Sequence, residues 1–186
     1  MTASTSTSES TSARTGAPSL GQRMARAWRH WLRSSSAGRQ AFPDDSLRAI
    51  GAAITAGEQT HRGELRLIVE NAMPSDAIWA GLDNRQRALA LFAEHGVWDT
   101  EENCGVLIYI NLADRKVDIV ADRAISRRID AATWKAICDT MTGGFARGEF
   151  HASTLAAIEQ VNTLLRQHFP ANGARGNELP DQPIVL

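Results

Sequence analysis

The chain has 186 residues, of which 43% are hydrophobic and 22% charged, and its formal net charge is −1. This length suits a single domain with a buried core. A nearly neutral chain lacks the basic character of nucleic-acid-binding proteins, so we expect no nucleic-acid partner. Two cysteines, Cys104 and Cys138, make neither a disulfide framework nor a zinc module.

The first 41 residues differ in composition from the rest. Residues 1–19 are rich in Ser and Thr, which predicts a disordered tail without the apolar core of a signal peptide. Residues 20–41 predict a basic amphipathic helix at 20–33, with Trp28 and Trp31 on its apolar side, and then a linker. This helix would dock on an anionic membrane surface or a protein partner, or pack back on the domain. Because no apolar run could span a bilayer, we expect a cytoplasmic chain, peripheral at the membrane if the helix docks there.

Helices and strands alternate across residues 42–170, the predicted domain. Apolar periodicity predicts helices near 44–58, 74–95, 133–141 and 150–168, and strands near 65–69, 105–110 and 117–121. The first two strands flank a helix and should be parallel, whereas the third follows a short turn and should be antiparallel. We therefore predict a three-layer α/β/α fold with a small mixed sheet. Gly143 and Gly144 predict the end of the third helix, and residues 171–186 predict an extended C-terminal arm.

This topology brings polar side chains from three segments to one edge of the sheet. The chain enters the first strand at 61–64, enters the second at 101–104 and leaves the third at 122–123. Oxygen ligands gathered there would suit Ca²⁺ or Mg²⁺. The predicted metal ligands are Glu64, Glu102, Asn103, Asp122 and His61. Arg123 can hold a phosphate by a bidentate contact, so Asp122 and Arg123 are the candidate catalytic residues. Alternatively, these charges pair with one another and with loop amides, and only hold the strand ends together.

Several segments in combination resemble the TPM-domain family. They are FPDDSL at 42–47, EQTHRGELRLIVE at 58–70, RALALFAEHGVWDTEENCGVLIYINLADRKVDIVADRAI at 87–125, FARGEF at 145–150, LLRQHFP at 164–170 and NELPDQPIVL at 177–186. The resemblance implies a compact α/β/α fold with a small mixed sheet. It also implies an acid-phosphatase-like activity, divalent-metal binding, or a role in the assembly or repair of membrane protein complexes.

Two positions depart from the family pattern. Cys104 stands where members commonly have Asn, and Ala124 stands where they commonly have Gly. The first change removes a hard oxygen donor, and the second disfavours a positive φ angle. Since no nucleophile motif is present, our first hypothesis is an interaction module that binds a divalent cation and docks to a partner or a membrane surface. The alternative is a metal-assisted, acid-phosphatase-like hydrolase of phosphomonoesters.

Overall fold

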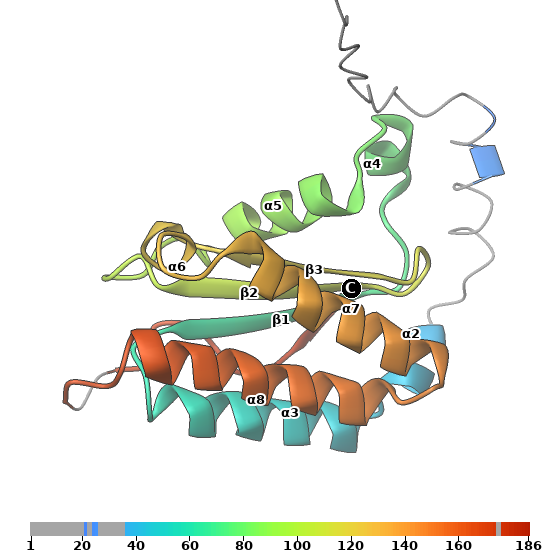
Figure 1. Cartoon of the computed structure of the whole chain (residues 1–186). Coiled ribbons are helices and arrows are strands. Elements are labelled where there is room, and N and C mark those ends of the chain that lie inside the picture. Colours follow the sequence, from blue (N-terminus) through green and yellow to red (C-terminus); the bar gives the residue numbers. More distant parts are fainter. Residues whose placement is uncertain (1–20, 22–23, 26–35, 174–175) are drawn as a thin grey trace, which may run out of the picture.

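The computed structural model describes Gly21, Met24, Ala25 and residues 36–173 and 176–186. In these ranges the chain forms a four-stranded sheet, in the order β3-β2-β1-β4, with helices on both faces (Figure 1). The strands are β1 (Glu64–Glu70), β2 (Gly105–Asn111), β3 (Lys116–Ala121) and β4 (Ile184–Val185). The predicted α/β fold is confirmed. The predicted tail at 1–19 and most of the predicted helix at 20–33 lie outside the described residues.

The strand directions agree with the prediction. β1 and β2 are parallel, with Glu64 opposite Gly105, and β2 and β3 are antiparallel, with Val106 opposite Ala121. The crossover from β1 to β2 passes through two helices on one face, α4 (Ser75–Trp79) and α5 (Asn84–Glu94). The helical region predicted at 74–95 is thus divided. Gly81 has a φ of 78° between the two helices, and the Asp83 side chain caps α5 by accepting from the backbone N–H of Gln86.

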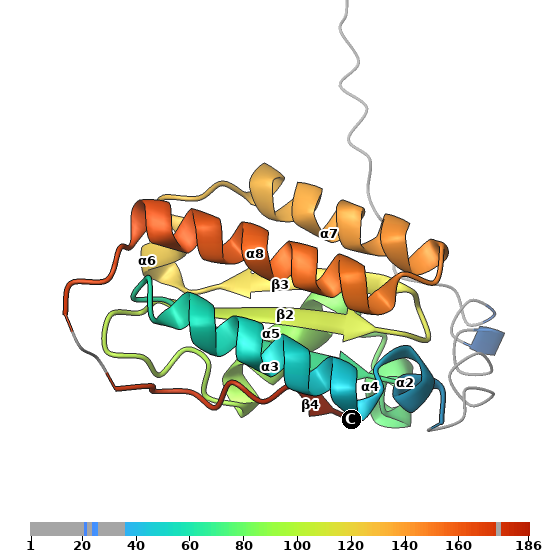
Figure 2. The same ribbon diagram turned by 90° about the horizontal axis from the view of Figure 1, so that it is seen from below.

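Three longer helices cover the other face, α3 (Asp44–Glu58), α7 (Ala131–Ala146) and α8 (Phe150–His168) (Figure 2). Alternate residues of β1, such as Leu65 and Leu67, enter the core shared with these helices, whereas Ile68 joins Leu107 and Tyr109 on the α5 side. Every residue of β1 and β2 is buried. Continuous burial is what a sheet covered on both faces requires, and it explains the unbroken apolar run of β2.

Two helix boundaries differ from the sequence-based expectation. α7 continues through Gly143 and Gly144 to Ala146, so the prediction that these glycines end the helix was wrong. In this region the glycine with a positive φ, 81°, is Gly148, which lies between α7 and α8. A short helix, α2 (Ser36–Ala41), also occupies part of the predicted linker. Of the helices described, none is both long and apolar enough to cross a bilayer.

Other parts of the chain contact the sides of β1 and β3 that face away from β2. β4, in the predicted C-terminal arm, lies parallel to β1, with Ile184 opposite Ile68. This fourth strand was not predicted. At the opposite edge, the Arg85 side chain of α5 donates a hydrogen bond to the carbonyl of Ile119 in β3. A further short helix, α6 (Arg123–Ser126), follows β3 directly and lies at the end of the sheet where β1 and β2 begin (Figure 1).

Candidate functional site

The convergence predicted at the start of β1 and β2 is present in the backbone. The Glu64 N–H donates to the Cys104 carbonyl at 3.1 Å, and the Asp122 N–H donates to the Gly105 carbonyl at 2.9 Å. Arg123 returns to the second segment through its side chain, because its Nη2 donates to Asn103 Oδ1 at 3.1 Å. The hairpin of β2 and β3 therefore brings Asp122 and Arg123 beside Asn103, as the sequence predicted.

Asp122 uses only one of its two carboxylate oxygens. Oδ1 accepts a hydrogen bond from the Arg123 N–H at 2.6 Å and so caps α6. The other oxygen, Oδ2, is buried and has no hydrogen-bond partner, and the residue as a whole is 7% exposed. Buried carboxylate oxygens are normally hydrogen-bonded or paired with a cation, so an Oδ2 without a partner is unusual and marks this position as a candidate site.

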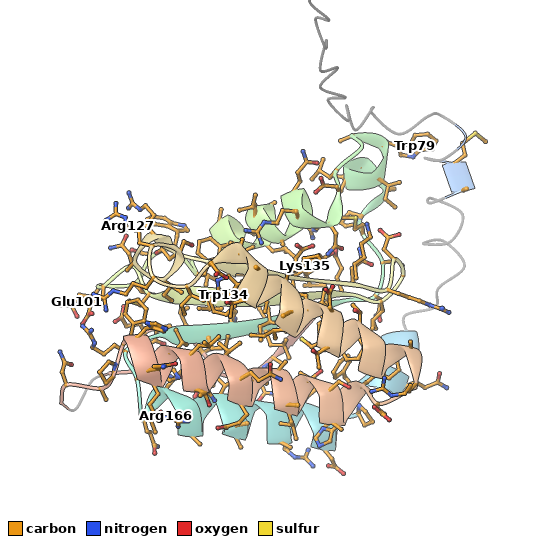
Figure 3. The ribbon with its side chains drawn as sticks, in the orientation of Figure 1. Trp79, Glu101, Arg127, Trp134, Lys135 and Arg166 are labelled. Atoms are coloured by element: carbon orange, nitrogen blue, oxygen red, sulfur yellow. The ribbon has the colours of Figure 1, made fainter. Side chains whose placement is uncertain are left out.

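Two pockets lie along this edge of the sheet. One, of about 340 Å³, lies between α3 and the C-terminal arm, and the other lies beside α6. The pocket beside α6 has a volume of about 330 Å³ and is lined by Glu102, Asn103, Arg123, Ala124 and Arg127. Figure 3 shows Arg127 and Glu101 at this end of the molecule. Arg127 is exposed, and its side chain forms no ion pair or hydrogen bond with another described residue. Two guanidinium groups beside a carboxylate and an amide can bind an anionic group such as a phosphate.

The other predicted metal ligands have different partners. Glu102 forms an ion pair with Arg62, and Glu64 Oε2 accepts from the Leu179 N–H at 3.2 Å. His61 is buried, with Nδ1 3.1 Å from the Gly63 carbonyl and Nε2 3.1 Å from Asn162 Oδ1. Burial lowers the pKa of His61. The two oxygens that contact its ring act in the opposite direction, because they favour the charged imidazole.

The predicted ligands are therefore near one another along the edge without pointing at one centre. Within 36–173, 176–186 and the three described N-terminal residues, no group of three or more His, Cys, Asp and Glu side chains is arranged to hold a metal ion. Metal binding at this edge stays a prediction. Its best-supported ligand is Asp122, whereas His61 and Glu64 are occupied by structural contacts.

A model of the TPM domain matches residues 37–164, which is more than half of the chain. This chain belongs to the TPM-domain family. The NMR structure of BA42 from the psychrophilic bacterium Bizionia argentinensis is similar, with a TM-score of 0.68 and 24% identity over 77% of this chain and 94% of that one. At this identity the similarity supports the fold alone. No curated protein matches the chain.

The two departures from the TPM pattern have clear structural settings. Cys104 is 1% exposed, and its Sγ donates to the Glu102 carbonyl at 3.4 Å, so its thiol faces away from solvent. Ala124 lies within α6, and it is not among the described non-glycine residues with positive φ, which are Asn103 and Arg115. The alanine therefore causes no backbone strain in this TPM domain. Asn103, with a φ of 54°, is the strained position next to the pocket, and Asn is a residue that tolerates it.

Sequence reasoning missed two features of this TPM domain. The first is the pair of arginines beside the pocket at α6. Arg127 lies four residues after Arg123, and this spacing, which can be read in the sequence, places both side chains on one side of a helical turn. The second is a close pair of acids, Glu58 at the end of α3 and Asp181 in the C-terminal arm, which line the pocket between these two segments. No local pattern connects residues so far apart, so no sequence signal could have predicted that pair.

Proposed function

We propose that this TPM domain is an interaction module that binds a hydrated divalent cation and a phosphate-bearing partner at the edge of the sheet beside Asp122. The observation that carries the proposal is the Asp122 carboxylate, whose buried Oδ2 has no hydrogen-bond partner. A buried anionic oxygen without a donor is costly, and a cation would supply the missing charge. The neighbouring guanidinium groups of Arg123 and Arg127 supply the complementary charge for a phosphate.

The available ligands favour Mg²⁺ over Ca²⁺. Ca²⁺ takes six to eight oxygen ligands, whereas Mg²⁺ keeps several waters and is held by one or two carboxylates together with phosphate oxygens. Asp122 has a free carboxylate oxygen, but Asn103 Oδ1 already accepts from Arg123 and Glu102 is paired with Arg62. A mostly hydrated ion that also contacts the partner's phosphate fits this small set of protein oxygens.

The test is metal-dependent stabilisation of the full-length protein. Mg²⁺ and Ca²⁺ are added separately during thermal unfolding, with EDTA as the blank. Binding to the folded state alone stabilises by about 2.7 kcal/mol at a hundredfold excess over the dissociation constant. Wild type should gain stability and Asp122→Asn should not. The matched control is Asp130→Asn, which also replaces a helix-capping aspartate, at the start of α7. It should respond to metal like wild type.

The proposal fails if neither metal stabilises the wild type. It also fails if Asp122→Asn keeps the full response, because the stabilising ion would then bind elsewhere. Phosphate binding is checked by adding inorganic phosphate with and without Mg²⁺ and following backbone amide shifts. Arg127→Gln should weaken those shifts severalfold without changing the melting temperature, because the Arg127 side chain is exposed.

The alternative function is metal-assisted hydrolysis of phosphomonoesters, which the same carboxylate and arginines would support. The residues that line the pocket include no hydroxyl, thiol or imidazole, so a metal-bound water would have to be the nucleophile. The lack of a nucleophilic side chain among these lining residues favours binding over hydrolysis. Release of p-nitrophenol from p-nitrophenyl phosphate, dependent on Mg²⁺ and absent in Asp122→Asn, would support the alternative. Metal-dependent stabilisation without turnover would support the interaction module.

Docking to an anionic membrane surface through residues 20–33 is a separate part of the proposal. It is supported by the sequence pattern of tryptophans and arginines in that segment. Full-length protein should sediment with vesicles that contain phosphatidylserine, and less so as salt is raised. Replacing Arg23, Arg26, Arg29 and Arg33 by Gln should abolish sedimentation. Equal sedimentation of the variant would contradict docking by this segment.

A further inference from the structure

A further pocket lies at the other end of the sheet from Asp122, between the β2–β3 hairpin and the junction of α7 with α8. Its volume is about 350 Å³, and it is more enclosed than the pocket beside α6. Figure 1 shows the hairpin tip, the end of α7 and the start of α8 at the same end of the molecule. Ligand sites in proteins are concave, mainly apolar and of about 300–1,000 Å³. This pocket is therefore large enough for one small molecule.

The walls of this pocket are mainly apolar. The Phe145 and Phe150 rings are stacked with their centroids 5.0 Å apart, and both also pack edge-on against the buried ring of Phe42. Leu112 and Ala146 extend the apolar lining. Phe145 and Phe150 are only partly buried, so their packing against Phe42 holds them in place while part of each side chain stays in water. An aromatic or aliphatic group that covered them would remove this apolar surface from water.

Arg115 is the one charged residue among the described residues that line the pocket. Its side chain is exposed and forms no ion pair or hydrogen bond with another described residue. The neighbouring acid, Asp114, does not line the pocket, and its N–H donates to Asn111 Oδ1 at 3.0 Å, which fixes the turn that carries Arg115. A guanidinium beside an apolar wall is complementary to a carboxylate that is attached to an apolar group.

The backbone of Arg115 has an unfavourable conformation. Its φ is 54°, in the left-handed region where glycine or asparagine is the usual residue. Glycine would make the same turn without this strain, but it would not supply a guanidinium. A strained residue that is kept at a turn beside a pocket points to a role for its side chain there.

We propose that this pocket binds a small anionic amphiphile, a carboxylate with an aromatic or aliphatic body, which packs its body against Phe145 and Phe150 and pairs its carboxylate with Arg115. The site is separate from the proposed metal and phosphate site. Asp122 is bonded to Gly105 at the start of β2, whereas Asn111, which lines this pocket, is at the end of the same strand. Binding here should therefore need no metal.

The test is a titration of full-length protein with phenylpropionate, followed by NMR of backbone amides and leucine methyl groups. The Leu112 methyl signals and the Ala146 amide signal should shift and saturate. The Leu89 methyl signals, from an exposed leucine of α5, should stay in place and so exclude non-specific apolar binding. The neutral alcohol phenylpropanol should bind about fivefold more weakly, since it cannot form an ion pair with the exposed arginine. The absence of saturable shifts, or equal affinity for the two probes, would overturn the proposal.

Three variants assign the roles of the lining residues. Arg115→Gly should bind the two probes equally, and its melting temperature should not fall, because glycine adopts this φ without strain. Lys116→Gln removes the adjacent exposed cation, which does not line the pocket, and should keep the preference for the carboxylate. Ala146→Trp adds a large ring at an exposed position of α7, so the protein should fold with the pocket filled and bind neither probe.

The proposal is ruled out if Ala146→Trp binds phenylpropionate like wild type. It is also ruled out if Lys116→Gln loses the preference for the carboxylate as fully as Arg115→Gly, because the attraction would then come from the general charge of the hairpin. A marked fall in the melting temperature of Arg115→Gly would contradict it as well, since the arginine would then stabilise the turn itself.

Discussion

Gly144 of α7 lies directly against Ser153 of α8. A Cβ atom on Gly144 would be 1.7 Å from Ser153 Oγ and 2.7 Å from Ser153 Cβ. This position has no room for a side chain, and Gly144 is buried where the two helices approach. Gly143, its neighbour, is exposed, and a Cβ there would meet only the end of Arg147, at 3.8 Å. Of the two glycines, only Gly144 is required for the close packing of α7 against α8.

We predict opposite effects for alanine at the two positions. Gly144→Ala should destabilise the protein by about 1–3 kcal/mol, since α7 and α8 would have to move apart. Gly143→Ala should stabilise it by about 0.5–1 kcal/mol, because alanine is the better residue in a helix interior. Urea unfolding followed by tryptophan fluorescence measures both. Equal effects for the two variants would contradict the close approach of these helices.

A second prediction concerns the buried acid at the end of β1. Glu70 is 2% exposed, and it accepts from Arg87 Nη2 at 2.6 Å and from the Tyr109 hydroxyl at 2.6 Å. Arg87→Met would leave this carboxylate buried without its cation, at a cost of about 3–5 kcal/mol. Tyr109→Phe should cost about 1.5–3 kcal/mol, since it removes one hydrogen bond to a charged group.

The control for Arg87 is an exposed ion pair. Arg147→Met removes the partner of Glu149 on the surface and should leave the midpoint of urea unfolding almost unchanged. If Arg87→Met had as little effect as Arg147→Met, the Glu70 carboxylate would have to be solvated in the folded protein. The double variant Glu70→Gln, Arg87→Met should be less destabilised than the sum of its parts, because neither partner is left charged and alone.

The third prediction is a pH dependence of stability due to Glu58. Its pKa is about 9 in the folded protein against a reference value of 4.5, so between these values the folded state holds a proton that the unfolded state releases. The free energy of unfolding should therefore decrease as pH rises through this window. Glu58→Gln should remove this slope, and it should be clearly more stable than wild type at pH 8 and similar at pH 5. A constant difference between the two proteins at both pH values would show that Glu58 does not titrate in this range.

His61 should give the opposite slope at lower pH. Burial lowers its pKa from the reference value of 6.5, so the unfolded chain takes up a proton before the folded protein does. Its contribution to stability should be complete above about pH 6.5 and be lost as pH falls towards the folded value. An imidazole NMR titration should place the pKa of His61 below the reference value of 6.5. A titration of His61 at or above that value would mean that the ring is solvated.

The sequence predicted those features that depend on local patterns. The alternation in β3 and the continuous apolar run of β2 predicted a hairpin, and the hairpin alone predicted that Arg123 returns to Asn103. Which residues contact one another at the edge of the sheet could not be predicted from the sequence. Glu64 binds the backbone of Leu179, a residue far away in the chain, and β4 has only two residues, too few for any periodicity. Long-range contacts made by an arm with so little regular structure leave no pattern in the sequence.

The hydrogen bond from the Arg85 side chain to the carbonyl of Ile119 affects how readily separate copies of the protein associate. An outer strand with unsatisfied backbone groups is a template on which another chain can add a strand, which is a common beginning of aggregation. Arg85 occupies one such group on β3, and its positive charge opposes the approach of a second apolar strand. On the other side of the sheet, β4 pairs with the apolar strand β1, so the outer strand there has only two residues and offers a short template to a neighbouring chain.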